Sequence, residues 1–295
     1  MAITAAQVKE LRGITGAGMM DCKKALTECD GDIQRSIDWL REKGISKAAK
    51  KADRIAAEGL SKVVVKGDKA CLVEINSETD FVAKNEQFLS LLDTVANALL
   101  DSNVSTMDEA LKIEVNGKQL ADVLVDTTAT IGEKITLRRF EIMTKNTNDT
   151  FGSYVHMGGK ISACVILKDV ASDELAKDMA MQIASMSPQY VSRDHMPSEI
   201  VEHERSIQTE ITKNDPQFEG KPEKVITGAI EGRVGKALQD MCLVDQVFFK
   251  NTSEKVKNIL KDAKTEVISF VRYAVGEGIE KKEENFADEV AKQIK

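Results

Sequence analysis

The chain has 295 residues, of which 42% are hydrophobic and 30% charged, and its formal net charge at pH 7 is −7. This length allows two or more domains with a substantial core, and the composition is typical of a globular protein and excludes a disordered one. The acidic net charge disfavours a general nucleic-acid binder. The sequence contains no run of about 18 uncharged apolar residues, so we expect no membrane-spanning helix.

The first 44 residues are predicted to form three short helices. A capping-box pattern at residues 4–7 starts the first helix, which should end near Gly13. The second helix should cover residues 19–29, and the third should stop at Gly44. This arrangement is that of a ubiquitin-associated-type three-helix module, which buries little apolar surface and is marginally stable alone.

Four apolar residues of this module are candidates for contact with a partner. Val8 and Leu11 share a face of the first helix, while Met19 and Met20 lie at the mouth of a glycine turn. Methionine is flexible and polarizable, which suits a surface that must adapt to a partner. Because a module this small also needs apolar residues for its own core, both assignments stay open.

A basic segment follows the module. Residues 1–54 hold eleven Lys and Arg against eight Asp and Glu, a net charge of +3, and the basic residues concentrate at 43–54. Such a segment is either a nucleic-acid arm or an alanine-rich charged linker, and the linker is the commoner explanation. We therefore expect no direct contact with nucleic acid.

Residues 68–98 and 159–187 read as two copies of one unit. Each copy has a polar glycine turn, an apolar strand and a capped helix, and each should close with a strand that comes later in the chain. The strands expected on this basis are residues 70–75, 135–140, 163–167 and 267–275. The pattern predicts an α+β fold whose core is two repeated α/β subdomains with antiparallel sheets.

The first copy carries an unusual residue at the start of its helix. Phe81 stands beside Asp80 in the first turn, where a polar residue is expected. When the copies are paired, Val82 matches Leu175, but Phe81 matches Glu174. Phe81 either packs locally or is an exposed wedge for a partner.

A helical hairpin is expected within the second unit. All four prolines lie within 35 residues of one another, and two of them, Pro197 and Pro222, should each open a helix at its first position. The two helices would form a protruding antiparallel hairpin of the coiled-coil, dimerisation type. Such a hairpin cannot bury both of its apolar stripes, so we expect it to meet another chain.

After the hairpin, residues 244–249 and a capped helix from Ser253 should lead back to the second sheet, and a terminal amphipathic helix should cover residues 281–294. The expected division of the chain is a three-helix module with basic linker over 1–54, core subdomain N over 55–148, core subdomain C over 149–188 and 238–272, the hairpin over 189–237, and a C-terminal module over 273–295.

Catalytic and metal-binding motifs are lacking in the sequence. No phosphate-binding G-x-x-x-x-G-K-[ST], G-x-S-x-G or H-E-x-x-H motif occurs, and the five cysteines form no C-x-x-C pair. We therefore expect a non-enzymatic protein without metal or cofactor. Of the three histidines, His156 is the candidate for a direct role, because it is expected at a loop tip before Gly158 and Gly159. The N-terminus has no signal-peptide pattern, so we expect a cytoplasmic protein.

Four segments carry recognisable motifs. They are residues 11–26, which contain Thr15-Gly16-Ala17-Gly18-Met19-Met20, then Thr79-Asp80-Phe81-Val82-Ala83-Lys84, Gly152-Ser153-Tyr154-x-His156, and residues 272–280. Together they resemble the bacterial elongation factor Ts family, whose members exchange the guanine nucleotide of elongation factor Tu. The likeness spans essentially all 295 residues, apart from extra length between about residues 100 and 150.

The resemblance implies how these residues act. The partner-binding site would comprise Thr79, Asp80, Phe81, Val82 and His156. In the family, the Asp-Phe pair inserts near the magnesium of the partner's G domain, and the histidine disturbs the phosphate-binding loop. The N-terminal module docks on a G-domain helix through the positions of Val8, Leu11, Met19 and Met20, and the hairpin and C-terminal module make further contacts. Homodimerisation through the hairpin occurs in some members only.

Three other functions remain as alternatives. A non-catalytic adaptor would bind a GTPase equally tightly with and without GDP. An RNA-binding chaperone would use the basic linker, and its affinity would fall steeply with salt. An enzyme is unsupported, since no catalytic constellation is found.

Overall fold

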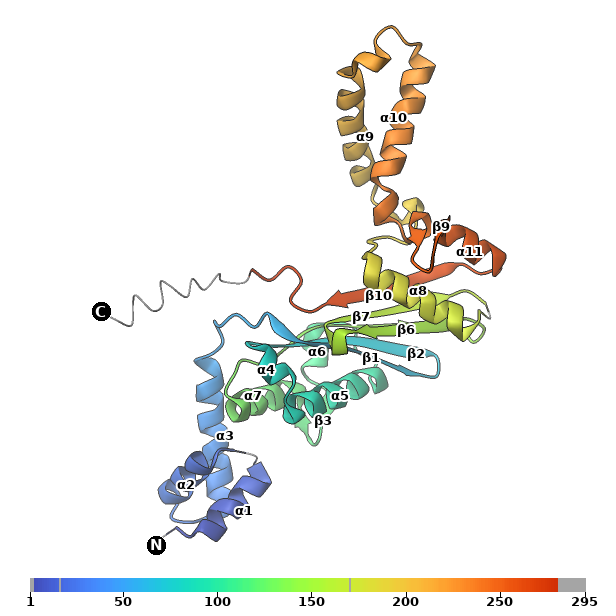
Figure 1. Ribbon diagram of the computed structural model, residues 1–295. Helices are drawn as coiled ribbons and strands as arrows, with labels where there is room; N and C mark the ends of the chain where they lie inside the picture. The colour runs from blue at the N-terminus through green and yellow to red at the C-terminus, as the bar shows by residue number, and fades with distance from the viewer. Residues whose placement is uncertain (1–2, 16, 170, 281–295) are drawn as a thin grey trace, which may run out of the picture.

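The computed structural model describes residues 3–15, 17–169 and 171–280. It begins with three helices, α1 (Ala5–Thr15), α2 (Met19–Glu28) and α3 (Ile33–Ala49). The three helices lie together at the N-terminal end of the molecule (Figure 1). They pack around a small core that includes Leu11, Cys22 and Leu26. At the start of α1, the Gln7 side chain accepts from the Thr4 amide at 3.0 Å, while the Thr4 hydroxyl accepts from the Gln7 amide at 3.3 Å. These are the reciprocal bonds of the capping box that the sequence predicts.

Helix α3 does not stop at Gly44, as the sequence predicted, but continues to Ala49. Gly44 is buried, and a Cβ added to it would lie 3.2 Å from the Cβ of Ala129. Ala129 belongs to α7 (Leu120–Ile131). The glycine therefore allows two helices to approach closely, and it does not end the first of them.

The first sheet has the strand order β1-β2-β5 and is antiparallel throughout. Its strands are β1 (Glu58–Lys66), β2 (Lys69–Ser77) and β5 (Thr136–Thr144). One face packs on helix α5 (Glu86–Asp101), where Val73 and Ile75 join Phe88 in a common core. The segment of extra length folds as α6 (Met107–Ala110), a small hairpin of β3 (Glu114–Val115) and β4 (Lys118–Gln119), and α7.

The second sheet repeats this topology with the order β10-β7-β6, again antiparallel. Its strands are β6 (Thr150–His156), β7 (Ile161–Leu167) and β10 (Val267–Ala274). Helix α8 (Asp173–Met186), capped by the Ser172 hydroxyl, covers one face of it. The α+β fold with antiparallel sheets is thus confirmed.

The remaining faces of the two sheets pack against each other. Leu72 and Ala70 of the first sheet meet Cys164 and Ile166 of the second. Alternation along β2 explains this arrangement, because odd-numbered residues face α5 and even-numbered residues face the second sheet. The two subdomains therefore share an apolar interface.

Helices α9 (Ser198–Lys213) and α10 (Glu223–Ala237) lie side by side and extend away from the sheets (Figure 1). Pro197 and Pro222 are the residues before the first helical turn and not its first positions, a shift of one residue from the prediction. At the base, Val234 and Leu238 form a small core with Met196 and Cys242. Towards the tip the apolar side chains Ile207, Ile211 and Val225 are exposed.

The chain returns through β8 (Val247–Phe248), β9 (Asn251–Lys255) and α11 (Val256–Asp262). Ser253 lies within β9, so the helix starts three residues later than predicted. Short 3₁₀ turns occur at Met157–Gly159, Arg193–His195, Pro216–Phe218, Gln239–Met241 and Leu243–Asp245. The terminal helix expected over 281–294 lies outside the described residues. Among those described, no helix has the length and apolar character needed to cross a membrane.

Candidate functional site

Phe81 lies on α4 (Asp80–Ala83), a single helical turn that directly follows β2. The hydroxyl of Thr79 caps this turn by accepting from the Val82 amide at 3.4 Å. On the inner side, Val82 packs against the core of subdomain N, and Ala83 is buried. Phe81 points the other way, with 80% of its surface exposed. Among the residues that the structure describes, Phe81 therefore has no apolar pocket, so local packing against them does not hold.

The second subdomain provides the comparison that the repeat suggested. Helix α8 begins after Ser172, and its Glu174 side chain is 85% exposed. Leu175, the counterpart of Val82, packs on the core of its own subdomain. The two copies thus expose the same position, and only the first fills it with an aromatic ring.

Asp80, next to Phe81, is held as a carboxylate. A hydrogen bond of 2.8 Å from Lys84 and, at longer range, the charge of Lys160 lower the pKa of Asp80. The Lys84 ammonium also lies 6.0 Å from the centre of the Phe81 ring. This corner therefore presents an aromatic ring beside an ion pair, a combination suited to a partner surface that is both charged and apolar.

His156 is the last residue of β6, not part of a loop tip as expected, and it is exposed. The Tyr154 hydroxyl lies 3.2 Å from His156 Nδ1, which fixes the imidazole on the strand end. Its neighbours Val155 and Met157 are also exposed, Met157 by 71%. The strand end therefore carries two exposed apolar residues that are adjacent to the histidine in the chain.

The Phe81 helix and the His156 strand end are both fastened to the first half of β1. The backbone of Gly59 in β1 is paired with Asn76, shortly before Phe81 in the chain. From the other subdomain, Lys160 donates to Glu58 Oε2 at 2.7 Å and to the Gly59 carbonyl at 3.3 Å. The two candidate elements are thus joined through one strand.

A second contact brings the turn after His156 against β1. The Ser61 hydroxyl lies 2.9 Å from the Gly159 carbonyl oxygen, to which it donates, and 2.8 Å from the Ser162 hydroxyl. Gly159 has φ +106°, and a Cβ there would lie 2.8 Å from the Ser61 carbonyl oxygen. Only glycine allows this approach, because it lacks a Cβ and accepts positive φ.

The N-terminal candidates divide into two groups. Met19 and Met20 are exposed, by 57% and 76%, and are available for contact. Val8 and Leu11 are buried in the core of the module, Leu11 completely. Their side chains hold the three helices together, so in this structure the assignment of these two residues to the core is the one that applies.

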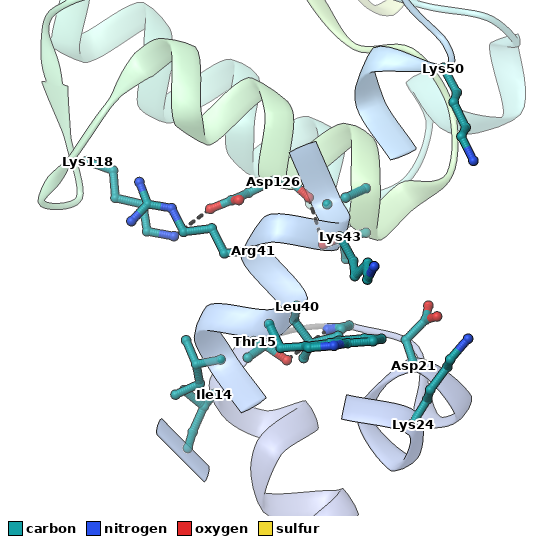
Figure 2. A pocket seen from close by; sticks show the side chains of 16 residues that line it. Ile14, Thr15, Asp21, Lys24, Leu40, Arg41, Lys43, Lys50, Lys118 and Asp126 are labelled. Carbon is teal, nitrogen blue, oxygen red and sulfur yellow. Dashed lines mark hydrogen bonds and ion pairs between the residues drawn. The ribbon is translucent and has the colours of Figure 1, made fainter. Parts of the chain in front are cut away.

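A cavity of about 590 Å³ lies between the N-terminal module and α7 (Figure 2). Trp39 and Lys43 of α3 contribute to its lining, and Lys118 is paired with Asp126 on the far side. None of the candidate contact residues lines it. The cavity is therefore separate from the Phe81 helix and from the His156 strand end.

Three residues of this surface escaped the sequence-based prediction. Val155 and Met157 flank His156, and Lys160 bridges to β1. Met157 precedes two consecutive glycines, and this pattern could have predicted that it lies at a tight, accessible turn. The contact of Lys160 could not be predicted from a local sequence pattern, because its partner Glu58 lies 102 positions earlier in the chain.

Among the described residues, no group of three or more His, Cys, Asp or Glu side chains is arranged to hold a metal ion. The five cysteines are free and buried. The Phe81 helix and the His156 strand end are instead surface features that suit contact with a protein partner. One belongs to the first subdomain and the other to the second.

Comparison with models of protein families identifies a match to this chain. The family model described as Elongation factor TS matches residues 78–277. The match starts just before the Phe81 helix, includes His156 and both hairpin helices, and covers more than half of the chain. The chain therefore belongs to the elongation factor Ts family, whose members are nucleotide exchange factors for elongation factor Tu in translation elongation.

Proposed function

We propose that this protein promotes GDP release from elongation factor Tu by inserting Asp80 and Phe81 beside the magnesium site of the partner. The observation that supports this most strongly is the exposed ring of Phe81 on a turn whose next two residues, Val82 and Ala83, are packed inward. An aromatic ring held in water by a fixed turn favours any conformation of a partner that buries it. His156, with Val155 and Met157, acts on the phosphate-binding loop from the other subdomain.

Exchange requires only differential binding. The factor must bind the nucleotide-free partner more tightly than the GDP-bound one, and linkage then weakens GDP binding by the same ratio. Burial of the Phe81 ring contributes about 2–3 kcal/mol, and each ~1.4 kcal/mol of differential binding changes the GDP affinity about tenfold. One ring that fits only the distorted partner therefore supplies a large part of the effect without bond chemistry.

The other parts of the molecule serve attachment in this proposal. The N-terminal helices form a ubiquitin-associated-type module that docks on a partner helix through Met19 and Met20, supported by the buried Val8 and Leu11. The exposed apolar side chains of the α9–α10 hairpin meet either the partner or a second copy of the chain. The division into module, two subdomains, hairpin and C-terminal module belongs to the same proposal, as do Thr79 and Val82 as supports of the wedge.

The test is the release of a fluorescent GDP analogue from purified elongation factor Tu, chased with unlabelled GDP, across a titration of this protein. The wild type should accelerate release at substoichiometric amounts, and Phe81→Ala should lower the maximal rate by about 30-fold or more. His156→Ala should also lower it. Glu174→Ala, at the equivalent exposed position of the second subdomain, is the control and should leave release unchanged.

The adaptor interpretation gives a different result. An adaptor binds the partner in sedimentation experiments but does not accelerate release, and its affinity is equal with and without GDP. Wild-type release by a folded Phe81→Ala protein would refute the wedge.

A further inference from the structure

The basic linker after α3 is attached to the turn that follows α7. Lys51 donates to the Gly132 carbonyl oxygen. In the opposite direction, the Lys134 ammonium donates to the carbonyl oxygens of Ala52, at 2.5 Å, and Arg54, at 3.0 Å. The linker and the turn at residues 132–134 are therefore joined by hydrogen bonds in both directions, each from a lysine of one segment to the backbone of the other.

The same turn holds the cap of the Phe81 helix. One oxygen of the Glu133 carboxylate accepts from the Thr79 amide at 2.9 Å, and the other accepts from the Thr79 hydroxyl at 2.7 Å. Both are charge-assisted hydrogen bonds, which are stronger than neutral ones. Since the Thr79 hydroxyl also accepts from the Val82 amide, the carboxylate orients the cap from outside the helix.

A second carboxylate joins the linker to the residue before that cap. Glu78 Oε1 accepts from the Lys134 amide at 2.6 Å, and Glu78 Oε2 accepts from the Arg54 guanidinium at 3.1 Å. Glu78 is thus held from the linker and from the turn at the same time. The chain of contacts runs without interruption from the end of the N-terminal module to the residues that precede Asp80.

A single turn of helix needs such external support. Helix α4 has four residues, and an isolated helix of that length is unstable in water. The turn that supports it is itself fixed, because Gly132 adopts φ +90° at the end of α7 and the Ile135 amide donates to the Thr128 hydroxyl at 3.1 Å. The orientation of Phe81 is therefore set by residues about 50 positions away in the sequence.

We infer that the turn at residues 132–134 is a positioning element for Phe81, in which Glu133 orients the Thr79 cap and Glu78 links that cap to the linker of the N-terminal module. The inference rests on the proposed role of Phe81 in nucleotide release. Glu133, Glu78, Lys134 and Arg54 act through the helix and not on the partner. The linker charges Lys51 and Arg54 thereby have a function inside the protein and need no nucleic acid.

The test uses the full-length protein in the same release assay, with Glu133→Ala as the main variant. Loss of two charge-assisted bonds should let the helix reorient, and we expect the maximal release rate to fall about tenfold. The concentration of half-maximal effect, which reports docking through the rest of the surface, should change less than twofold. Glu133→Gln, which keeps one acceptor oxygen, should recover part of the rate, and Arg54→Ala should lower it about twofold. Asp101→Asn removes an exposed pair with Lys66 in the same subdomain and is the control.

A double-mutant cycle distinguishes positioning from a general structural role. If Glu133 acts through Phe81, Glu133→Ala should have no further effect in a Phe81→Ala protein. Amide hydrogen exchange at Val82 and Ala83 should become faster in Glu133→Ala and Arg54→Ala, while exchange in α5 stays unchanged.

Three results would overturn the inference. They are wild-type release by Glu133→Ala, unchanged amide exchange at Val82 and Ala83, or an equal loss with and without Phe81. Each of these results leaves the proposed function intact, provided that the Phe81→Ala protein itself releases the GDP analogue slowly. Wild-type release by Phe81→Ala would instead remove the proposed function, and the inference with it. If Glu133→Ala fails to fold, Glu133→Gln and Arg54→Ala decide by the same readouts.

Discussion

Glu74 is a charged residue with a side chain that is completely buried. It accepts from Arg138 at 3.0 Å and from Arg139 at 2.7 Å, both on the neighbouring strand β5. It also accepts from the amide of Gly276, just after the last strand of the other subdomain, at 2.9 Å. The motif at residues 272–280 is thereby anchored to subdomain N, which gives that sequence signature a structural role.

Replacement of Glu74 by alanine should destabilise the protein by about 3–5 kcal/mol, because two partly buried guanidinium groups and a partly buried amide lose their shared acceptor. Urea unfolding followed by circular dichroism measures the change. Asp93→Asn, which removes an exposed pair with Lys62, should change the free energy of unfolding by less than about 0.5 kcal/mol. Equal losses from the two variants would contradict this account.

At the level of single residues, the internal repeat made exposure of Phe81 one of two alternatives that the structure could decide. Phe81 could be recognised because Glu174 occupies its position in the second copy. Val8 and Leu11 had no such comparison, and an apolar helix face serves a core and a contact surface equally well. The partners of Glu74 and Glu133 were out of reach, since they depend on chain segments brought together only by the fold.

Among the elements, strand β6 shows most clearly how packing positions the site. Its residue Gly152 lies so close to α8 that an added Cβ would be 1.9 Å from the Ala176 carbonyl oxygen. Backbone cannot yield as a flexible side chain can, so this contact sets the distance between helix and strand. The strand then runs four residues further to His156.

Gly152→Ala should therefore displace α8 or prevent the native packing of subdomain C, with a loss of several kcal/mol and impaired nucleotide release. The matched variant is Gly228→Ala on the exposed side of α10, where no atom lies within 4 Å of the new Cβ. That substitution should stabilise the protein by about 0.5–1 kcal/mol, because alanine restricts the unfolded chain. Thermal unfolding of the two variants should shift in opposite directions, and a shift in the same direction would count against the argument.

Whether a segment forms a helix or a strand could be predicted from the sequence more often than the residues at which it begins and ends. The apolar strands and the capped helices had clear local signals, and the predicted strands lie within or within one residue of β2, β5, β7 and β10. Helix α3 was placed too short because Gly44 signals an end locally, whereas the close contact with Ala129 is a tertiary effect. The predicted helix start at Ser253 was wrong because this residue, although a good helix cap, lies within strand β9.

At the scale of the whole molecule, the N-terminal module is not separate from the core. Helix α3 crosses α7 at Gly44, and Arg41 pairs with Asp122 at 3.1 Å. The single tryptophan of the chain, Trp39, lines the cavity beside this crossing, with Lys43 5.5 Å from its ring centre. Its position makes Trp39 an intrinsic reporter of whether the module is docked.

Gly44→Leu should separate the module from α7, because the crossing has no space for a side chain. Acrylamide quenching of Trp39 fluorescence should then increase, while the circular dichroism spectrum of the helices is maintained. Gly13→Leu provides the control, since nothing lies within 4 Å of that position. Unchanged quenching in Gly44→Leu would show that the module is held by other contacts.

The five cysteines give the molecule a property useful in the laboratory. All are buried, and burial raises the pKa of Cys71 and Cys164 to about 12, so thiolate forms only when the fold opens. Native protein should therefore react slowly with maleimides, at a rate that reports local opening of the segments that bury these thiols. Against this silent background, Phe81→Cys would offer a single accessible thiol, on which a spectroscopic label could follow the engagement of elongation factor Tu in real time.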